Sequence, residues 1–238
     1  MFYVDVAACR TPRPFPNHAS SGAPPVIPLT RVRAASGEIV IARRRQDGAI
    51  GYWKRGYLQT MVRADGENEA DFISTAVRLI SAGQPSRALV LGFGGGVAST
   101  LLDRQGIEVV SIDSDACARG LATRFFKAPL HLKVVTADAM AFLHATPLGL
   151  FDAALVDLQD SKAVPPAYTS PLFWTSLVRA LTPDAQVVLN ATAWLWRSEH
   201  WVECQRALGE AGLITQELSQ PMLWENRLLT TKTPQEAL

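Results

Sequence analysis

Glycine is concentrated in the segment LVLGFGGGVAST, residues 89–100, where an apolar run meets Gly92, Gly94, Gly95 and Gly96. Glycine loses more conformational freedom on folding than any other residue, so a cluster indicates unusual backbone angles or close approach to a ligand. A tight strand-to-helix turn is the alternative explanation. Since ligands of α/β proteins bind beyond the carboxyl ends of the strands, the loop predicts a ligand site at that edge.

Three further apolar segments end in aspartate, at Asp113, Asp138 and Asp157. Asp113 lies about 20 residues beyond the glycine loop, the spacing at which an acidic side chain takes ribose hydroxyls. Asp138, followed by the small Ala139, is then expected to face an adenine amino group, and it can also cap the helix that follows. Together these residues predict a nucleoside ligand.

The kind of nucleoside follows from what the glycine loop lacks. A dinucleotide fingerprint needs a third glycine where Val97 stands, and no Gly-Lys-Ser/Thr follows, which excludes a phosphate-binding P-loop. The extra carboxylates nearby favour a cation over an anionic dinucleotide. The predicted cofactor is S-adenosylmethionine or decarboxylated S-adenosylmethionine, in which a sulfonium cation is attached to adenosine.

Asp157 and Asp160 form a pair of acids in the segment LVDLQDSK. Either acid alone could serve as a loop cap. An alkylamine has a pKa of about 10 and must lose a proton before it attacks carbon. A carboxylate beside a sulfonium site can orient the ammonium group and accept that proton, so the expected substrate is a small-molecule amine.

Alternating strand and helix patterns predict the fold that positions these residues. Apolar strands separated by helices are typical of a parallel sheet covered on both faces, and the last strand pair is expected to be antiparallel. We predict an α/β fold over residues 66–238, with a doubly wound, mostly parallel, seven-stranded Rossmann-like sheet of the S-adenosylmethionine-dependent methyltransferase type. Residues 1–65 are expected to hold a proline-rich arm, up to about residue 36, and a small β-hairpin section. The predicted helix N-caps include Asn68, Ser170 and Ser198.

The composition argues against several classes of partner. The 23 Lys and Arg residues nearly balance 22 Asp and Glu residues, so neither nucleic acid nor an anionic membrane is expected as a partner. No apolar stretch approaches about 18 residues, and the N-terminus lacks the pattern of a signal peptide. Three dispersed cysteines and four dispersed histidines give no metal-ligand spacing, so we expect no metal and a cytoplasmic location.

The sequence resembles the spermidine synthase family, the polyamine aminopropyltransferases, over residues 68–193, with a faint extension at the cofactor-binding candidate Gln59. The family segment strand-Asp-Ser-Ser-Asp-Pro matches Asp157 and Asp160 at both acids, and the family's adenine-binding Asp-Gly pair matches Asp138 and Ala139. The resemblance implies that Asp157 is the general base and that Asp160 binds the substrate amine. It also makes a homodimer a possible assembly.

Three positions depart from the family pattern. Gly95 replaces the acid that holds the cofactor's propylamine, the ribose-binding glutamate falls on Ser111 with Asp113 as substitute, and a Tyr-Gln pair falls on Ala70 and Asp71. Without the acid, position 95 no longer repels the carboxylate of intact S-adenosylmethionine and is expected to expose backbone N–H groups to it. This slightly favours the intact cofactor.

Three functions are compatible with these residues. The first is a spermidine synthase-like transferase that moves an alkyl group, aminopropyl or related, from the sulfonium cofactor to an amine. The alternatives are a small-molecule methyltransferase using the same site and a non-catalytic nucleoside-binding or scaffold protein. Tyr168, in the loop after the acids, is a candidate substrate contact, with core packing as the alternative.

Overall fold

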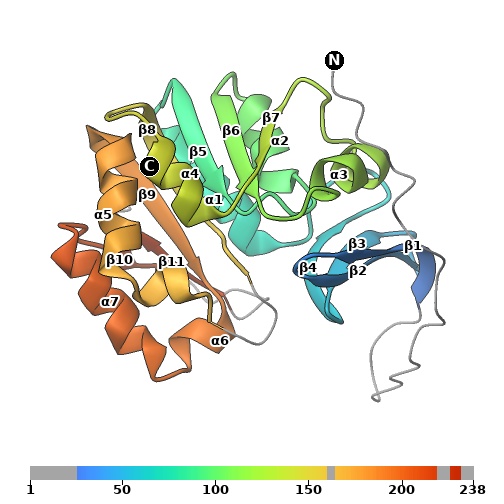
Figure 1. Cartoon of the computed structure of the whole chain (residues 1–238). Helices are drawn as coiled ribbons and strands as arrows, with labels where there is room; N and C mark the ends of the chain where they lie inside the picture. Colours follow the sequence, from blue (N-terminus) through green and yellow to red (C-terminus); the bar gives the residue numbers. More distant parts are fainter. Residues whose placement is uncertain (1–25, 160–163, 219–225, 232–238) are drawn as a thin grey trace.

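The computed structural model of the chain describes residues 26–159, 164–218 and 226–231. These residues form two β-sheets, a small antiparallel sheet near the N-terminus and a larger sheet with helices on both faces (Figure 1).

The small sheet has its four strands in chain order, each antiparallel to the next. They are β1 (Val26–Ala34), β2 (Gly37–Arg44), β3 (Ile50–Lys54) and β4 (Tyr57–Val62). The small β-section predicted from the sequence is therefore confirmed, and it contains two more strands than a hairpin.

Residues 26–34, the last part of the predicted extended arm, form an edge strand of this sheet. An edge strand tolerates Pro28, whose missing N–H would interrupt an inner strand. The pairing of β1 with β2 shifts register between Pro28 and Thr30, which absorbs the irregularity. Residues 1–25 of the predicted arm lie outside the described residues.

The large sheet has seven strands in the order β10-β11-β9-β8-β5-β6-β7. Strands β5 to β9 pair in parallel, whereas β11 is antiparallel to β9 and to β10. This confirms the predicted Rossmann-like, methyltransferase-type fold with its antiparallel end. The strands are β5 (Arg87–Leu91), β6 (Glu108–Asp113), β7 (Lys133–Thr136), β8 (Phe151–Val156), β9 (Leu181–Ala191), β10 (Gln216–Glu217) and β11 (Arg227–Thr230).

The order of the strands reverses at β5, which lies between β6 and β8. Such a switch point opens a crevice beyond the carboxyl ends of the central strands. The glycine loop follows β5 directly, and Asp157 follows β8, so the topology brings the two predicted features to the same crevice.

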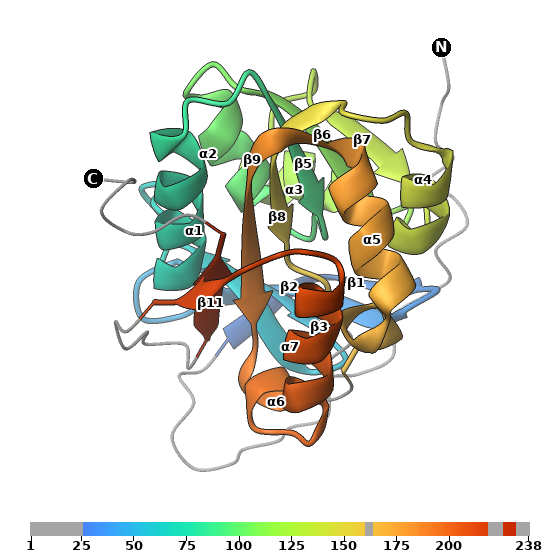
Figure 2. The same ribbon diagram turned by 90° about the vertical axis from the view of Figure 1, so that its left-hand side faces the viewer.

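Helices cover both faces of the large sheet (Figure 2). Helices α1 (Asp71–Ala82) and α2 (Val97–Asp103) pack on one face, while α4 (Ala139–Ala145), α5 (Pro171–Ala180) and α7 (His200–Glu210) pack on the other. Helix α3 (Ala118–Phe126) buries Leu121 and Phe126 against the small sheet and so joins the two sheets. Among the described helices, none is both long and apolar enough to cross a membrane.

The helix starts agree only in part with the predicted N-caps. Ser170 caps α5 as expected. Helix α1 instead has Ala70 at its N-cap, because the Asn68 amide is bonded to the backbone N–H and carbonyl of Ala70. Ser198 donates its hydroxyl to the end of the unexpected short helix α6 (Ala193–Trp196), so that Glu199 precedes α7.

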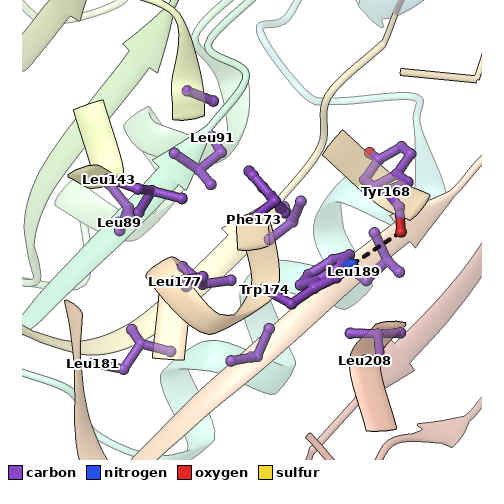
Figure 3. Packing of buried hydrophobic residues seen from close by; sticks show 14 of the residues in the cluster. Leu89, Leu91, Leu143, Tyr168, Phe173, Trp174, Leu177, Leu181, Leu189 and Leu208 are labelled. Atoms are coloured by element: carbon purple, nitrogen blue, oxygen red, sulfur yellow. Dashed lines mark hydrogen bonds between the residues drawn. The ribbon is translucent and has the colours of Figure 1, made fainter. Parts of the chain in front are cut away.

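The largest core cluster lies between β5, β8, β9 and helices α4, α5 and α7 (Figure 3). Trp174 is fully buried there and donates its indole N–H to the Tyr168 carbonyl at 2.9 Å. The Tyr168 ring stacks on Trp174, and its hydroxyl donates to the Leu158 carbonyl at 2.8 Å. The expected substrate contact through Tyr168 is therefore wrong. Its ring packs in the core, and burial raises the pKa of its phenol well above the usual range, so the group stays neutral.

Candidate active site

A cleft of about 540 Å³ lies beyond the carboxyl ends of β5, β6, β7 and β8, with β3 and β4 of the small sheet forming its opposite wall. Of the predicted site residues, Gly96 does not line this cleft, and Asp160 lies outside the described residues. The predicted residues that do line it are Gln59, Gly92, Gly94, Gly95, Asp113, Asp138, Ala139 and Asp157.

Gly92 is the residue at which the glycine loop touches the end of β8. Its φ is +99°, and a Cβ placed on it would lie 2.1 Å from the Asp157 carbonyl oxygen. The Asp157 N–H in turn donates to the Leu91 carbonyl at 2.8 Å. A side chain at position 92 would therefore push Asp157 out of the site, which explains this glycine without reference to a ligand.

Glycine is found at the other positions of the loop for different reasons. Gly96 has a φ of +72° and opens α2, with the Phe93 ring 2.7 Å from the position of its missing Cβ. Gly94 has a φ of +50° and open space around it. Of the loop glycines, Gly94 thus leaves open space beside its backbone in the cleft.

Asp113 holds the glycine loop in place. Its Oδ2 accepts the N–H groups of Phe93 and Gly94 at 3.0 and 2.9 Å, and its Oδ1 accepts the N–H of Asp115 at 2.9 Å. Since Gly96 donates to the Phe93 carbonyl, the Gly95 N–H is the loop amide without a partner among the described residues. Gly95 itself is buried, so the expectation that this loop exposes backbone N–H groups to an anion stays a prediction.

The ribose position implied by the family resemblance does not face the cleft. Ser111 is fully buried and shares a hydrogen bond of 2.8 Å with Ser99 of α2. Asp113, two residues further along, lines the cleft at the end of β6. A carboxylate has about four acceptor positions, so Asp113 can take ribose hydroxyls in addition to the loop N–H groups.

Asp138 stands at the end of β7 and caps α4, because its Oδ1 accepts the Ala141 N–H at 2.9 Å. The same residue lines the cleft together with Ala139 and Met140. The capping and ligand-facing roles expected from the sequence are thus geometrically compatible.

Asp157 presents a carboxylate to the cleft with its two oxygens in different surroundings. Oδ1 accepts the amide of Asn190 at 2.6 Å and that of Gln159 at 3.0 Å. Among the described residues, Oδ2 takes no hydrogen bond. Burial raises the pKa of the Asp157 carboxyl, and the two amide hydrogen bonds oppose that rise. Such a carboxyl is suited to take up a proton nearer neutral pH than an exposed aspartate.

Thr60 occupies the space beside Gly95. A Cβ at position 95 would lie 2.8 Å from the Thr60 Cγ2 atom, while the backbone φ of Gly95 is not positive. Thr60 is 4% exposed, and its Oγ1 is buried without a hydrogen-bond partner in the described chain. An unsatisfied buried hydroxyl costs about 1–3 kcal/mol, which a bound ligand could offset.

The small sheet adds residues to the cleft that sequence reasoning missed. Tyr52, Lys54 and Thr60 line it, and the Lys54 ammonium lies 3.2 Å from a carboxylate oxygen of the buried Asp115. In the sequence these residues show only an ordinary strand pattern. The contact between Lys54 and Asp115, just after β6, joins residues more than 50 positions apart and leaves no local signal. Within the described ranges, no three His, Cys, Asp or Glu side chains gather in a way that could hold a metal ion.

The strand order and the acid-lined cleft define a Rossmann-like fold of the methyltransferase type, with its crevice at the switch point. No family model matches the chain. Over 137 residues the chain is 30% identical to a spermine synthase of Arabidopsis thaliana, an alignment that covers 52% of this chain and 37% of that protein. The chain thus matches well under half of this relative's length.

Two solved structures show the same fold over most of the chain. One is described as a probable spermidine synthase from Corynebacterium glutamicum, with a TM-score of 0.69 at 15% identity over 87% of this chain and 80% of that one. The other is a spermidine synthase in complex with the transition-state analogue AdoDATO, with a TM-score of 0.70 at 15% identity over 85% of this chain and 72% of that one. The chain is therefore similar in sequence to a spermine synthase over about half of its length and shares the fold of two spermidine synthase structures, which confirms the resemblance expected from its sequence.

The contact at Gly92 predicts a specific loss of stability. Gly92→Ala should destabilise the fold by at least about 2 kcal/mol more than Gly94→Ala, because both need a positive φ but only position 92 meets backbone. Chemical denaturation of both variants measures the difference. Equal losses would show that the contact with Asp157 does not limit position 92.

Proposed function

We propose that this protein transfers an alkyl group from an S-adenosylmethionine-type sulfonium cofactor to a small-molecule amine, with Asp157 as the general base. The observation that carries the proposal is the Asp157 carboxylate, which belongs to a residue that lines the cleft and is held by two amides on Oδ1, while Oδ2 takes no hydrogen bond from the described residues. A non-catalytic nucleoside-binding protein has no need of a partly buried carboxyl with a raised pKa at this point.

The residues of the cleft fit such a cofactor. Asp113 would hold the ribose, Asp138 and Ala139 the adenine, and Gly94 and Gly95 the sulfonium arm, while the unpartnered Thr60 hydroxyl would meet the end of that arm. When bound, the cofactor supplies a carbon made electrophilic by the adjoining positive sulfur. The solved spermidine synthase complex with AdoDATO, which shares the fold, supports this class of ligand.

Asp157 would act on the acceptor amine. Its carboxylate attracts the ammonium group, accepts one proton at Oδ2 and so frees the nitrogen lone pair for attack. Oδ1 is already bonded to two amides, so the carboxylate keeps its orientation while Oδ2 takes the proton. Because burial raises the pKa of Asp157, turnover should increase with pH through a midpoint above the usual range of an aspartate.

A second cavity of about 460 Å³ is the place we propose for the body of the acceptor. It meets the cofactor cleft at Gln59 and Gln159, which line both. Its walls include Phe72 and Trp194, the latter 46% exposed although large and apolar. An acceptor lying there would bring its amine to Asp157, since Gln159 is bonded to that carboxylate.

Position 95 favours intact S-adenosylmethionine over the decarboxylated form. The loop has no acid there, and both the Gly95 N–H and the buried Thr60 hydroxyl have no hydrogen-bond partner among the described residues. Transfer of a methyl group or of the amino-acid-bearing chain is therefore a second candidate reaction at the same site. A homodimer and a cytoplasmic location remain predictions from the sequence and the family resemblance.

The cofactor form can be tested by restoring the acid at position 95. Gly95→Asp needs Thr60→Ser beside it, because the Thr60 methyl group occupies the space of the new Cβ. The double variant should shift binding at least tenfold toward decarboxylated S-adenosylmethionine, a difference of about 1.4 kcal/mol. Isothermal titration with both cofactors measures the ratio.

The matched control is Gly95→Asn with Thr60→Ser, which adds similar bulk without charge. If the Asp and Asn forms give the same affinity ratio, the electrostatic account of position 95 is wrong.

In the wild type, either sulfonium nucleoside should raise the melting temperature, and NAD should not. A shift with NAD alone would overturn the cofactor assignment.

Asp157→Asn tests the reaction itself. The amide is isosteric and can still accept from Asn190 and Gln159, but it cannot take a proton, so turnover should fall about 10²–10⁴-fold. Cofactor affinity should stay within about twofold, since Asp157 acts on the acceptor. Product analysis by mass spectrometry over a panel of amines provides the rates. Near-normal rates in the Asn variant would remove Asp157 from the proposed chemistry.

Trp194→Ala tests the second cavity. The loss of this wall should raise the acceptor KM about tenfold and leave cofactor affinity unchanged, because Trp194 lines the second cavity and not the cofactor cleft. Steady-state kinetics with the best acceptor of the panel measures both. An unchanged KM would place the acceptor elsewhere.

A further inference from the structure

We propose that Asn190, oriented by Asn226, is a positioning residue that determines which oxygen of Asp157 receives the substrate's proton. This inference rests on the proposed function of Asp157 as general base. It concerns three side chains that the fold brings together from the end of β8, from β9 and from the residue before β11.

The three side chains form a chain of short hydrogen bonds. The Asn226 Nδ2 donates to the Asn190 Oδ1 at 2.7 Å, and the Asn190 Nδ2 donates to the Asp157 Oδ1 at 2.6 Å. Asn190 is fully buried, and Asn226 is 9% exposed. Buried amides such as these are held by their partners, because leaving one unbonded costs about 1–3 kcal/mol.

Asn226 determines the direction of the Asn190 amide. An asparagine amide has a donor side and an acceptor side, and the donor from Asn226 occupies the acceptor side. The NH₂ group of Asn190 must then point at Asp157. The reversed amide would place a carbonyl oxygen against a carboxylate and an NH₂ group against an NH₂ group, with two hydrogen bonds lost.

The consequence is an asymmetric carboxylate. Asn190 and Gln159 both donate to Oδ1, so the lone pairs of that oxygen are already used in hydrogen bonds. Oδ2 is then the oxygen left to accept a proton from the cleft. Hydrogen bonds to the charged form of an acid also favour its ionisation. Asn190 thereby lowers the pKa of the Asp157 carboxyl and opposes the larger rise caused by burial.

Other ionisable groups face Asp157 less directly. The Tyr168 phenol on the 3₁₀ helix η2 (Pro166–Thr169) lies behind it and donates to the Leu158 carbonyl. Asp113, Asp138, Lys54 and Arg55 line the same cleft from β6, β7 and the small sheet. Among the described residues, only the two amides of Asn190 and Gln159 bond to the carboxylate itself.

Asn190→Leu removes the donor and keeps the bulk. The pKa of Asp157 should rise by about one unit, measured by ¹³C titration of labelled aspartate with Asp157→Asn to assign the signal. The acidic limb of the profile of kcat/KM against pH should move to higher pH by the same amount. At pH values below the pKa of Asp157, kcat/KM should therefore fall about tenfold. At alkaline pH, where Asp157 is ionised in both proteins, the difference should narrow.

Gln186→Leu is the matched control. Gln186 is an amide on the same strand, four residues away and 2% exposed, but it donates to the Thr230 hydroxyl at 3.2 Å and does not reach the cleft. Its replacement should leave the pKa of Asp157 and the pH profile unchanged. A shift equal to that of Asn190→Leu would overturn the positioning role, since any loss of a buried amide would then suffice.

Asn190→Asp provides a second variant if the leucine form does not fold. Two carboxylates at this distance share a proton, so the apparent pKa of the pair should rise further than in the leucine variant. An unchanged pKa of Asp157 in the variants of Asn190 overturns the proposal. Because the titration needs no turnover, it tests Asn190 even if every amine fails as an acceptor, a result that would instead count against the proposed function.

Discussion

The backbone contact between Gly92 and Asp157 is the constraint on which the rest of the site depends. Parallel pairing of β5 with β8 brings Leu91 level with Val156, and the next residue of each strand meets across the gap. Because Gly92 has no side chain, the Asp157 carbonyl oxygen can lie 2.1 Å from the position that a Cβ atom of residue 92 would occupy. The glycine loop and the carboxylate are thus two ends of one contact at the switch point of the sheet.

Two carboxylates stabilise this arrangement in different ways. Asp113 accepts three backbone N–H groups and uses its charge to shape the glycine loop. Among the described residues, Asp157 accepts only side-chain amides, both on one oxygen. The first carboxylate thus shapes the loop, while the second has an acceptor position that the described fold does not use. This difference, more than the number of acids, is why we propose a binding role for Asp113 and a reactive role for Asp157.

The small sheet supplies one wall of the cleft, with residues of β3 and β4. Thr60 fills the volume that a side chain at position 95 would need, so the two positions depend on each other. Tyr52 packs with Phe126 of α3 at 6.2 Å between ring centroids, which anchors this wall to the large sheet. A change of cofactor preference in a protein of this type would therefore require substitutions on both sheets.

The sequence alone determined the fold class, the order of strands and helices apart from β1 and α6, and the acids at the strand ends, because these depend on local apolar periodicity and on glycine placement. It also predicted that Asp138 could both cap a helix and face the ligand. The tertiary structure decided what no local pattern contains. It buried Tyr168 against Trp174 and placed Thr60 beside Gly95. It also joined Asn190 to Asp157 over a separation of 33 residues, and Asn226 to Asn190 over a separation of 36. These contacts arise from packing between distant strands, and a buried amide or threonine in a strand has the same sequence signature whether it faces a core or a cleft.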